Sequence, residues 1–454
     1  MNKHSAYALR QKQSLPLKQK IFMTERRIEQ WYDYWDGAVY VSFSGGKDST
    51  VLADIVARFC KKYRWKLYLL FINTGLEYPE IQKFVKQFAE WLRITYKIEV
   101  QLDIVRPEMR FDEVLKAYGY PVISKEVSNT ISGARNSIRK GVYSHRLCKL
   151  GVKREEYGGL YDSGEHDYDK ALEKSKFKQT KWRFLLDANF KASSYCCDVM
   201  KKKPAANYEK KTGRKPIIAT MAYESMNREN AWLKHGCNAF GAKKPKSTPM
   251  AFWTEQDVLY YLKTEMQQVL DKVWIDSQSI YRTKRKNARK YLRSIGYMKH
   301  LYASVYGDIR VKQQCETTDG QINIIDYLGC YEPGDVLETT GCKRTGCIFC
   351  MFGIMNDDCP NRFQRLKETH PRQYEYCIGG GEYVWKGTAY TSSGEPREIS
   401  WINDDGSPMS SEEIEKEVEE LKNNPHFKFE KVWQPSKEGL GLGGVLDYIG
   451  VNYE

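Results

Sequence analysis

Apolar and polar positions in the first hundred residues follow two different periods. Between residues 17 and 35, apolar side chains recur mostly every three or four positions, which predicts an amphipathic helix. Apolar runs at 38–41, 67–72 and 98–105 predict strands, and the helical patterns between them run to about residue 62 and from 80 to 92. Strands that alternate with helices indicate a doubly wound parallel sheet, so we predict an α/β fold.

The rest of the chain divides by composition. The polar, lysine-rich stretch 153–181 predicts a long connection, 216–220 a further strand, and 253–262 a helix that Thr254 caps. Near the end, Ser410 and Glu413 fit a capping box that begins an acidic helix. We therefore expect an N-terminal helix over 1–35, an α/β domain over 36–265 with an insertion at about 151–190, a basic helical segment over 266–326, and a cysteine-rich α+β module over 327–454.

Composition narrows the class of protein. The chain has 454 residues, 41% of them hydrophobic, and a formal net charge of +14. No window approaches about 18 consecutive apolar residues, and the polar start lacks the apolar stretch of a signal peptide, so we expect a cytoplasmic protein that does not bind membranes. In that compartment the 12 cysteines favour metal ligation or redox chemistry over disulfides. The positive charge suits a polyanionic partner.

A glycine turn joins the first predicted strand to the next helix. Residues 42–50 read Ser-Phe-Ser-Gly-Gly-Lys-Asp-Ser-Thr. Gly45 and Gly46 let the backbone approach a phosphate, and the amides at the helix start point at that anion. The spacing is that of neither the ATPase P-loop nor the Rossmann fingerprint. The turn predicts a phosphate site, with an ordinary glycine loop as the alternative.

This turn resembles the SGGxDS pyrophosphate loop of the adenine nucleotide alpha hydrolase superfamily. A second loop, 73–80, reads Asn-Thr-Gly-Leu-Glu-Tyr-Pro-Glu and resembles the other signature of the phosphoadenosine phosphosulfate (PAPS) reductase family, which normally has Asp in place of Asn73. Both loops follow strands, so they meet at the carboxyl edge of the sheet. The resemblance implies that an adenine nucleotide binds to Ser42, Ser44, Gly45, Gly46, Lys47, Asp48, Ser49, Thr50, Asn73, Thr74, Gly75 and Glu77.

Two later segments extend the resemblance. Residues 119–126 resemble the part that closes over the nucleotide in bacterial and phage members of the family, which implies that Ser124 and Lys125 contact a phosphate or sulfate group. A plain surface loop is the alternative there. Arg228 belongs to a stretch that resembles the arginine-bearing motif of the family and is expected on the nucleotide. Catalytic roles then fall to Lys47, Asp48 and Lys125, although Asp48 can instead serve only as a helix cap.

The cysteines give the second signal. Cys196 and Cys197 are adjacent, and Cys347 and Cys350 form a CxxC turn. This arrangement resembles the cluster ligands of adenylylsulfate (APS) reductases, so the resemblance implies a 4Fe-4S cluster on these four residues. Four thiolates satisfy tetrahedral zinc equally well. A local quartet of Cys342, Cys347, Cys350 and Cys359 is the alternative, because closing a short loop costs less chain entropy.

The family also has a catalytic cysteine near its C-terminus, whereas the last cysteine here is Cys377. The resemblance then favours the chemistry of the wider superfamily, as in the DNA phosphorothioation enzyme of this family: ATP with Mg²⁺ adenylates a substrate, pyrophosphate leaves, and a sulfur donor such as a cysteine desulfurase displaces AMP. A basic segment at 281–300 with interleaved tyrosines, and a basic surface of Arg362, Arg365, Lys367 and His370, favour nucleic acid as acceptor. The alternatives are a true PAPS or APS reductase and a non-catalytic nucleotide- or DNA-binding protein.

Overall fold

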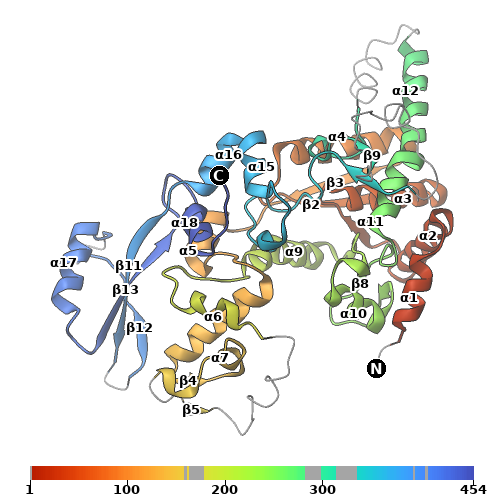
Figure 1. Ribbon diagram of the computed structural model, residues 1–454. Helices are drawn as coiled ribbons and strands as arrows, with labels where there is room; N and C mark the ends of the chain where they lie inside the picture. Colours follow the sequence, from red (N-terminus) through yellow and green to blue (C-terminus); the bar gives the residue numbers. More distant parts are fainter. Residues whose placement is uncertain are drawn as a thin grey trace, which may run out of the picture. The chain divides into compact units, whose positions relative to one another are not determined.

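The computed structural model of the chain describes residues 3–157, 161–162, 178–281, 298–312, 335–391, 394–403 and 407–454. It divides into two compact units, each built from two separated stretches of sequence (Figure 1). The first unit comprises Met1–Pro107 and Lys203–Cys347, and the second comprises Glu108–Lys202 and Ile348–Glu454.

A six-stranded sheet organises the first unit, in the order β3-β2-β1-β6-β8-β7. Its strands are β1 (Val39–Ser42), β2 (Leu67–Ile72), β3 (Val100–Val105), β6 (Lys215–Ile217), β7 (Asn238–Ala239) and β8 (Lys246–Ser247). Neighbouring strands run parallel except β7 and β8, which pair antiparallel at one edge. The predicted doubly wound parallel sheet is confirmed, and an antiparallel edge strand on such a sheet is common.

Helices cover both faces of this sheet. Those of the first unit are α1 (Ala6–Gln13), α2 (Leu17–Tyr34), α3 (Lys47–Tyr63), α4 (Pro79–Tyr96), α9 (Lys203–Thr212), α10 (Met226–His235), α11 (Glu255–Tyr261) and α12 (Gln267–Tyr281). On one face Tyr208 of α9 packs against Tyr40 and Leu70. Val41 and Leu69 point to the opposite face because side chains alternate along a strand, and α3 packs there between α2 and α4.

Helix α3 is buried on nearly every side, and the carboxylate of Asp54 in its middle is fully paired. Asp54 is 0% exposed; it accepts hydrogen bonds from the hydroxyls of Tyr96 (2.5 Å) and Tyr261 (2.7 Å), and it pairs with Arg58 at 3.0 Å. These contacts join α3 to α4 and α11. The helix that begins at the glycine turn is therefore held in place by buried polar contacts as well as by apolar packing.

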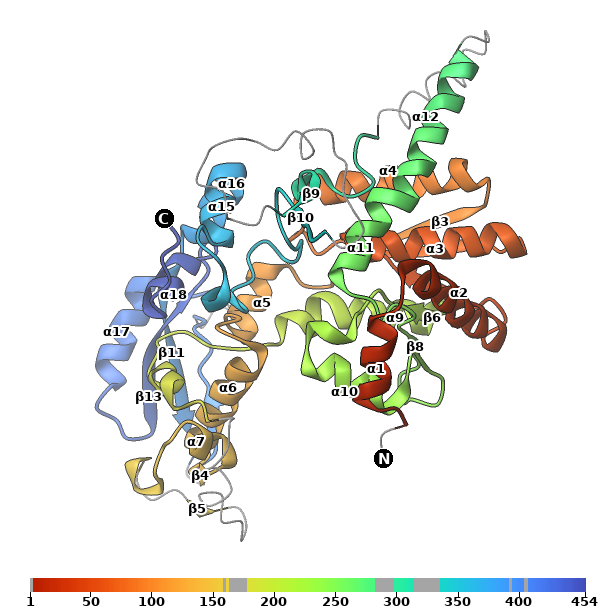
Figure 2. The ribbon, with the colours of Figure 1, turned by 45° about the vertical axis from the view of Figure 1, so that its right-hand side comes forward.

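Several boundaries that the sequence predicts agree with the structure. Thr254 caps α11, as expected, by accepting a hydrogen bond from the backbone N–H of Asp257 at 3.4 Å. Helix α12 projects from the rest of its unit (Figure 2), and a short antiparallel pair, β9 (Ile309–Val311) with β10 (Leu337–Thr339), follows it. Within the basic segment predicted at 281–300, residues 282–297 lie outside the described residues.

The second unit combines helices with a small antiparallel sheet. Its helices are α5 (Phe111–Tyr118), α6 (Lys125–Arg139), α7 (His145–Lys149), α15 (Arg362–Thr369), α16 (Pro371–Ile378), α17 (Ser411–Leu421) and α18 (Leu442–Tyr448). The sheet has the order β12-β11-β13, with β11 at Glu382–Tyr390, β12 at Pro396–Glu398 and β13 at Phe427–Gln434. The capping box that the sequence predicts at Ser410 and Glu413 begins α17. No helix in the described ranges is both long and apolar enough to cross a membrane.

Candidate functional site

The glycine turn between β1 and α3 has a conformation that depends on Gly45. This residue has a φ of +73°, and a Cβ added to it would lie 2.8 Å from the Cγ2 atoms of Ile81 and Val85. Both the left-handed backbone and the close approach of α4 therefore require glycine. The next residue, Gly46, is the N-cap of α3 and has no side chain to satisfy the amides of the first turn.

Hydroxyl groups from the first turn of α3 fix the shape of this loop. The Ser49 hydroxyl donates to the carbonyl of Gly46 at 2.9 Å and accepts from the backbone N–H of Ser44 at 3.2 Å. The Thr50 hydroxyl donates to the same Gly46 carbonyl at 3.0 Å. The N-cap residue Gly46 adds no side chain to this helix start at the end of a parallel strand, which is the local geometry of an anion site.

Lys47 is 5% exposed and is anchored by groups distant in sequence. Its ammonium pairs with the carboxylate of Glu255, in the first turn of α11, and donates to the carbonyl of Lys343 at 2.6 Å. Its backbone N–H donates to the hydroxyl of Tyr306 at 3.3 Å, and that hydroxyl lies 2.5 Å from Oγ1 of Thr345. The sequence prediction identifies Lys47 but misses the other residues, because no local pattern connects α11 or residues 306–345 with the turn.

Asp48 does not act as a helix cap. Its Oδ1 atom is buried and has no hydrogen-bond partner in the described part of the chain. Burial raises the pKa of this carboxyl, and so does Glu255, whereas the positive charges of Lys47, Arg344 and Arg228 lower it. A buried, unpartnered carboxylate oxygen costs free energy, so its retention favours a functional role over a structural one.

Arg228 lies near this carboxylate, and its expected contact with the nucleotide stays a prediction. It sits in the first turn of α10 and pairs with Glu224. Burial lowers the pKa of Arg228, and the positive charge of Arg344 lowers it further. Two guanidinium groups therefore act on Asp48 from the same unit. The sequence prediction includes only the first of them.

The second predicted loop is organised by its own side chains. Oδ1 of Asn73 accepts from the backbone N–H of Gly75 at 3.1 Å. Glu77 accepts from the hydroxyl of Thr74 at 2.6 Å and from its backbone N–H at 3.1 Å. Asn73 follows β2 directly, so this loop lies at the same edge of the sheet as the glycine turn. In this structure the Asn73 and Glu77 side chains shape the loop.

Ser124 and Lys125 belong to the second unit, whereas the glycine turn belongs to the first. The Ser124 hydroxyl caps α6 by accepting from the backbone N–H of Val127 at 3.1 Å. Lys125 lies beside the adjacent cysteines of the same unit. A hydrogen bond from Cys196, helped by the charges of Lys125 and Lys201 and opposed by burial, lowers the pKa of Cys197 to about 6.

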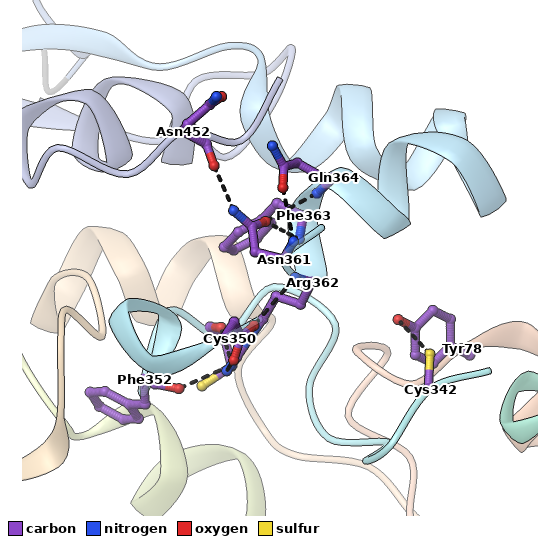
Figure 3. A network of polar contacts seen from close by, with 10 residues as sticks. Tyr78, Cys342, Cys350, Phe352, Asn361, Arg362, Phe363, Gln364 and Asn452 are labelled. Atoms are coloured by element: carbon purple, nitrogen blue, oxygen red, sulfur yellow. Dashed lines mark hydrogen bonds and ion pairs between the residues drawn. The ribbon is translucent and has the colours of Figure 1, made fainter. Parts of the chain in front are cut away.

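Cys350 lies in the same unit near Cys197. Burial raises the pKa of the Cys350 thiol, and the negative charge of Cys197 raises it as well. The turn around it is held by Arg362, whose guanidinium donates to the carbonyls of Cys350 (2.9 Å) and Phe352 (3.0 Å) and pairs with Asp357 at 2.7 Å (Figure 3). The sequence predicts Arg362 on a basic surface for nucleic acid, which stays a prediction; in the structure its guanidinium holds this turn.

The remaining cysteines differ in their surroundings. Cys347 is the last residue of the first unit, in which the Cys342 thiol contacts the Tyr78 hydroxyl at 3.8 Å (Figure 3). Cys359 is exposed. Cys377 is 0% exposed, and burial raises the pKa of its thiol well above the usual value, so it is poorly suited to act as a nucleophile.

The second unit offers thiolate ligands but not a finished metal site. The lowered pKa of Cys197 favours its thiolate, which is the form that binds iron or zinc. Within the described ranges, however, no three His, Cys, Asp or Glu side chains lie close enough together to hold a metal ion. The donor chemistry therefore fits an iron-sulfur or zinc site, and binding would have to draw the ligands together.

The parallel sheet and the anion-binding turn after β1 define an α/β protein of the adenine nucleotide alpha hydrolase-like class. Residues 38–150 match the family model described as the phosphoadenosine phosphosulfate reductase domain. No curated protein matches the chain. The family indicates an enzyme of nucleotide and sulfur chemistry. Arg228, Glu255, Tyr306 and Arg344 all lie beyond the matched residues.

Proposed function

We propose that the chain is an ATP-dependent enzyme that adenylates a substrate oxygen, releases pyrophosphate and prepares the activated position for sulfur transfer. The observation that carries the proposal is the glycine turn, where the N-cap residue Gly46 has no side chain and the buried Lys47 is followed by Asp48. The Oδ1 atom of Asp48 is buried and has no hydrogen-bond partner among the described residues. Helix amides and an ammonium suit the phosphates of a nucleotide, and a free carboxylate oxygen suits the magnesium that accompanies them.

The proposed chemistry needs charge stabilisation more than covalent help from the protein. A substrate oxygen attacks the α-phosphorus of ATP, the bond to the bridging oxygen breaks, and pyrophosphate leaves with that electron pair. The proton of the attacking hydroxyl passes to solvent. Lys47 and the amides at the start of α3 offset the charge that develops on pyrophosphate. The outer sulfur of a persulfide then displaces AMP from the substrate, and a second thiol reduces the resulting disulfide, which leaves sulfur on the substrate and releases the donor.

Magnesium would supply a bridge between the phosphate oxygens and neutralise part of their charge. Asp48 is the residue best placed to hold it, because its Oδ1 atom has no protein partner among the described residues. Ser49 is less available, since its hydroxyl already bonds to Gly46 and Ser44.

For the acceptor we propose nucleic acid, and for the sulfur source a persulfide donor such as a cysteine desulfurase. The support is the formal net charge of +14 together with the basic, tyrosine-containing sequence at 281–300. Binding that depends on phosphate contacts weakens steeply with salt. Nitrocellulose-filter binding of single-stranded DNA and RNA at 50 and 200 mM salt tests this part, and affinity that does not change with salt would contradict it.

We also propose that Cys196, Cys197, Cys347 and Cys350 hold a 4Fe-4S cluster, with zinc as the alternative. Protein purified without oxygen is expected to be brown and to contain iron and sulfide. Cys197→Ser should lose most of the iron, because a thiolate ligand becomes a weakly binding hydroxyl. Cys359→Ser is the matched control, since Cys359 is exposed, and it should retain the iron. A colourless protein that contains zinc, or equal loss in both variants, would contradict this assignment.

Product analysis separates the proposed function from its alternatives. Pyrophosphate and AMP formed from Mg·ATP support adenylation, and sulfite formed from PAPS with thioredoxin supports a true reductase. Tight nucleotide binding with neither set of products supports a non-catalytic binding protein. The burial of Cys377 disfavours the reductase, because it removes the last cysteine of this sequence as a candidate nucleophile.

A further inference from the structure

We propose that Arg344 is a specificity-determining residue of the nucleotide site and that it holds the terminal phosphate of a nucleoside triphosphate. Arg344 lies outside residues 38–150, so the family match does not assign it a role. The inference rests on the proposed function, because it requires that the glycine turn binds a nucleotide. It adds the part of the site that would distinguish ATP from AMP.

The segment that carries Arg344, residues 341–345, is anchored beside the glycine turn. Its start is fixed by backbone bonds, because the N–H of Gly341 donates to the carbonyl of Tyr306 and that of Cys342 to the carbonyl of Val305, both at 2.8 Å. The two residues that flank Arg344 also make contacts here. The carbonyl of Lys343 accepts from the Lys47 ammonium at 2.6 Å, and Oγ1 of Thr345 lies 2.5 Å from the Tyr306 hydroxyl.

The same segment also approaches Gly46 of the turn closely. A Cβ added to Gly46 would lie 3.3 Å from the Tyr306 hydroxyl and 3.4 Å from Oγ1 of Thr345. Arg344 is therefore held within reach of the start of α3 by contacts on both sides of it. All of these residues belong to the first unit.

Arg344 carries a positive charge that no protein group neutralises directly. In the part of the chain that the structure describes, it forms no ion pair or hydrogen bond, and its side chain is exposed. Its charge nevertheless acts on Asp48, Arg228 and Tyr223, so it lies near all three. The nearby guanidinium of Arg228 has its own partner in Glu224.

Asp48 and Arg344 thus have opposite charges and lie near one another, but neither makes a direct contact with the other. A magnesium–phosphate unit satisfies both, because its cation can face the carboxylate and its phosphate oxygens can face the guanidinium. Arginine suits this role, since its planar fork binds two phosphate oxygens at once. AMP would gain nothing from Arg344 if the glycine turn holds its single phosphate.

The test measures binding of Mg·ATP and AMP to the full chain by isothermal titration calorimetry. Arg344→Ala is expected to weaken ATP binding by about 10- to 100-fold, the loss of a charge-assisted contact, and to change AMP binding by less than about 3-fold. Arg344→Lys should recover only part of the affinity, because lysine keeps the charge but not the fork. Lys343→Ala is the matched control: it removes a neighbouring cation and keeps the carbonyl that binds Lys47, so ATP binding should remain within about 3-fold.

The outcomes distinguish this inference from the proposed function. If the wild-type chain binds ATP and releases pyrophosphate but Arg344→Ala binds ATP normally, the role of Arg344 is wrong and the proposed function stands. If Arg344→Ala and Lys343→Ala weakened ATP binding equally, the cause would be a general charge effect, and the role of Arg344 would again be wrong. If the wild-type chain binds no ATP, both proposals fall. Matching unfolding temperatures of the variants show that a lost affinity is not a lost fold.

Discussion

Replacing Asp48 with Asn is expected to reduce pyrophosphate release from Mg·ATP by at least about 100-fold and, at neutral pH, to make the folded chain more stable. The activity falls because a neutral amide cannot hold magnesium as a carboxylate does. The stability rises because burial, the largest influence on Asp48, disfavours its charged form and raises its pKa. A gain of about 1 kcal/mol in the free energy of unfolding is typical when a strained functional residue is neutralised.

The pH dependence of this gain follows from the direction of the shift. Because the pKa of Asp48 is higher in the folded chain than in the unfolded chain, ionisation of this group costs stability as the pH rises above its ordinary value of 3.8. The Asn variant does not lose stability in this way. The free energies of unfolding of the two proteins should therefore differ at pH 7 and converge below about pH 4. Urea unfolding of both proteins across this range measures the difference.

Asp54→Asn is the matched control, since Asp54 lies on the same helix but is fully paired with Arg58, Tyr96 and Tyr261. Removing that charge leaves Arg58 with only the partly exposed Glu265 as an ionic partner, so a loss of about 3 kcal/mol in the free energy of unfolding is expected. If Asp48→Asn also destabilised the chain, Asp48 would be a structural residue. If it retained normal turnover, the assignment of the site would be wrong.

Replacing Gly45 with Ala is expected to destabilise the chain by about 3 kcal/mol and to remove nucleotide binding. The first reason is the φ of +73°, which an L-residue adopts only with strain. The second reason is a clash: the new methyl group would lie 2.8 Å from the side chains of Ile81 and Val85. Relief of this clash pushes the turn away from the start of α3. Thermal unfolding and ATP calorimetry measure the two effects.

Gly75→Ala separates strain from packing. Gly75 has a similar φ of +76°, but a Cβ added there meets nothing within 4 Å. Gly75→Ala should therefore lower the free energy of unfolding only by the backbone strain, about 1 kcal/mol. Equal destabilisation by the two substitutions would show that the approach of α4 to the turn does not matter. Normal ATP binding by Gly45→Ala would contradict the anion site itself.

Much of the first unit can be predicted from the sequence because each element carries its own period. The runs at 38–41 and 67–72 are apolar over a length that suits a buried strand, and the helices after them repeat apolar residues at helical spacing. The Gly45-Gly46 pair likewise marks its turn locally, because a left-handed residue between strand and helix favours glycine.

The rest of the site cannot be predicted in this way, because it depends on contacts between distant segments. Glu255 follows a helix cap and looks architectural, and only the fold brings its carboxylate to Lys47, 208 residues earlier. Nothing in the local sequence marks Tyr306 or Arg344. The hydrogen bonds from Arg362 to the carbonyls of Cys350 and Phe352 also arise from the fold of the turn and have no mark in the local sequence.

The most direct test of the account is incubation of the chain with Mg·ATP labelled on the α-phosphate, with nucleic acid and a persulfide donor present, followed by identification of every labelled product. The label is expected to pass to the acceptor and then to be released as AMP, with one pyrophosphate formed for each AMP, and Asp48→Asn is expected to form both products at least about 100-fold more slowly. Intact ATP under these conditions, together with sulfite formed from PAPS and thioredoxin, would contradict it.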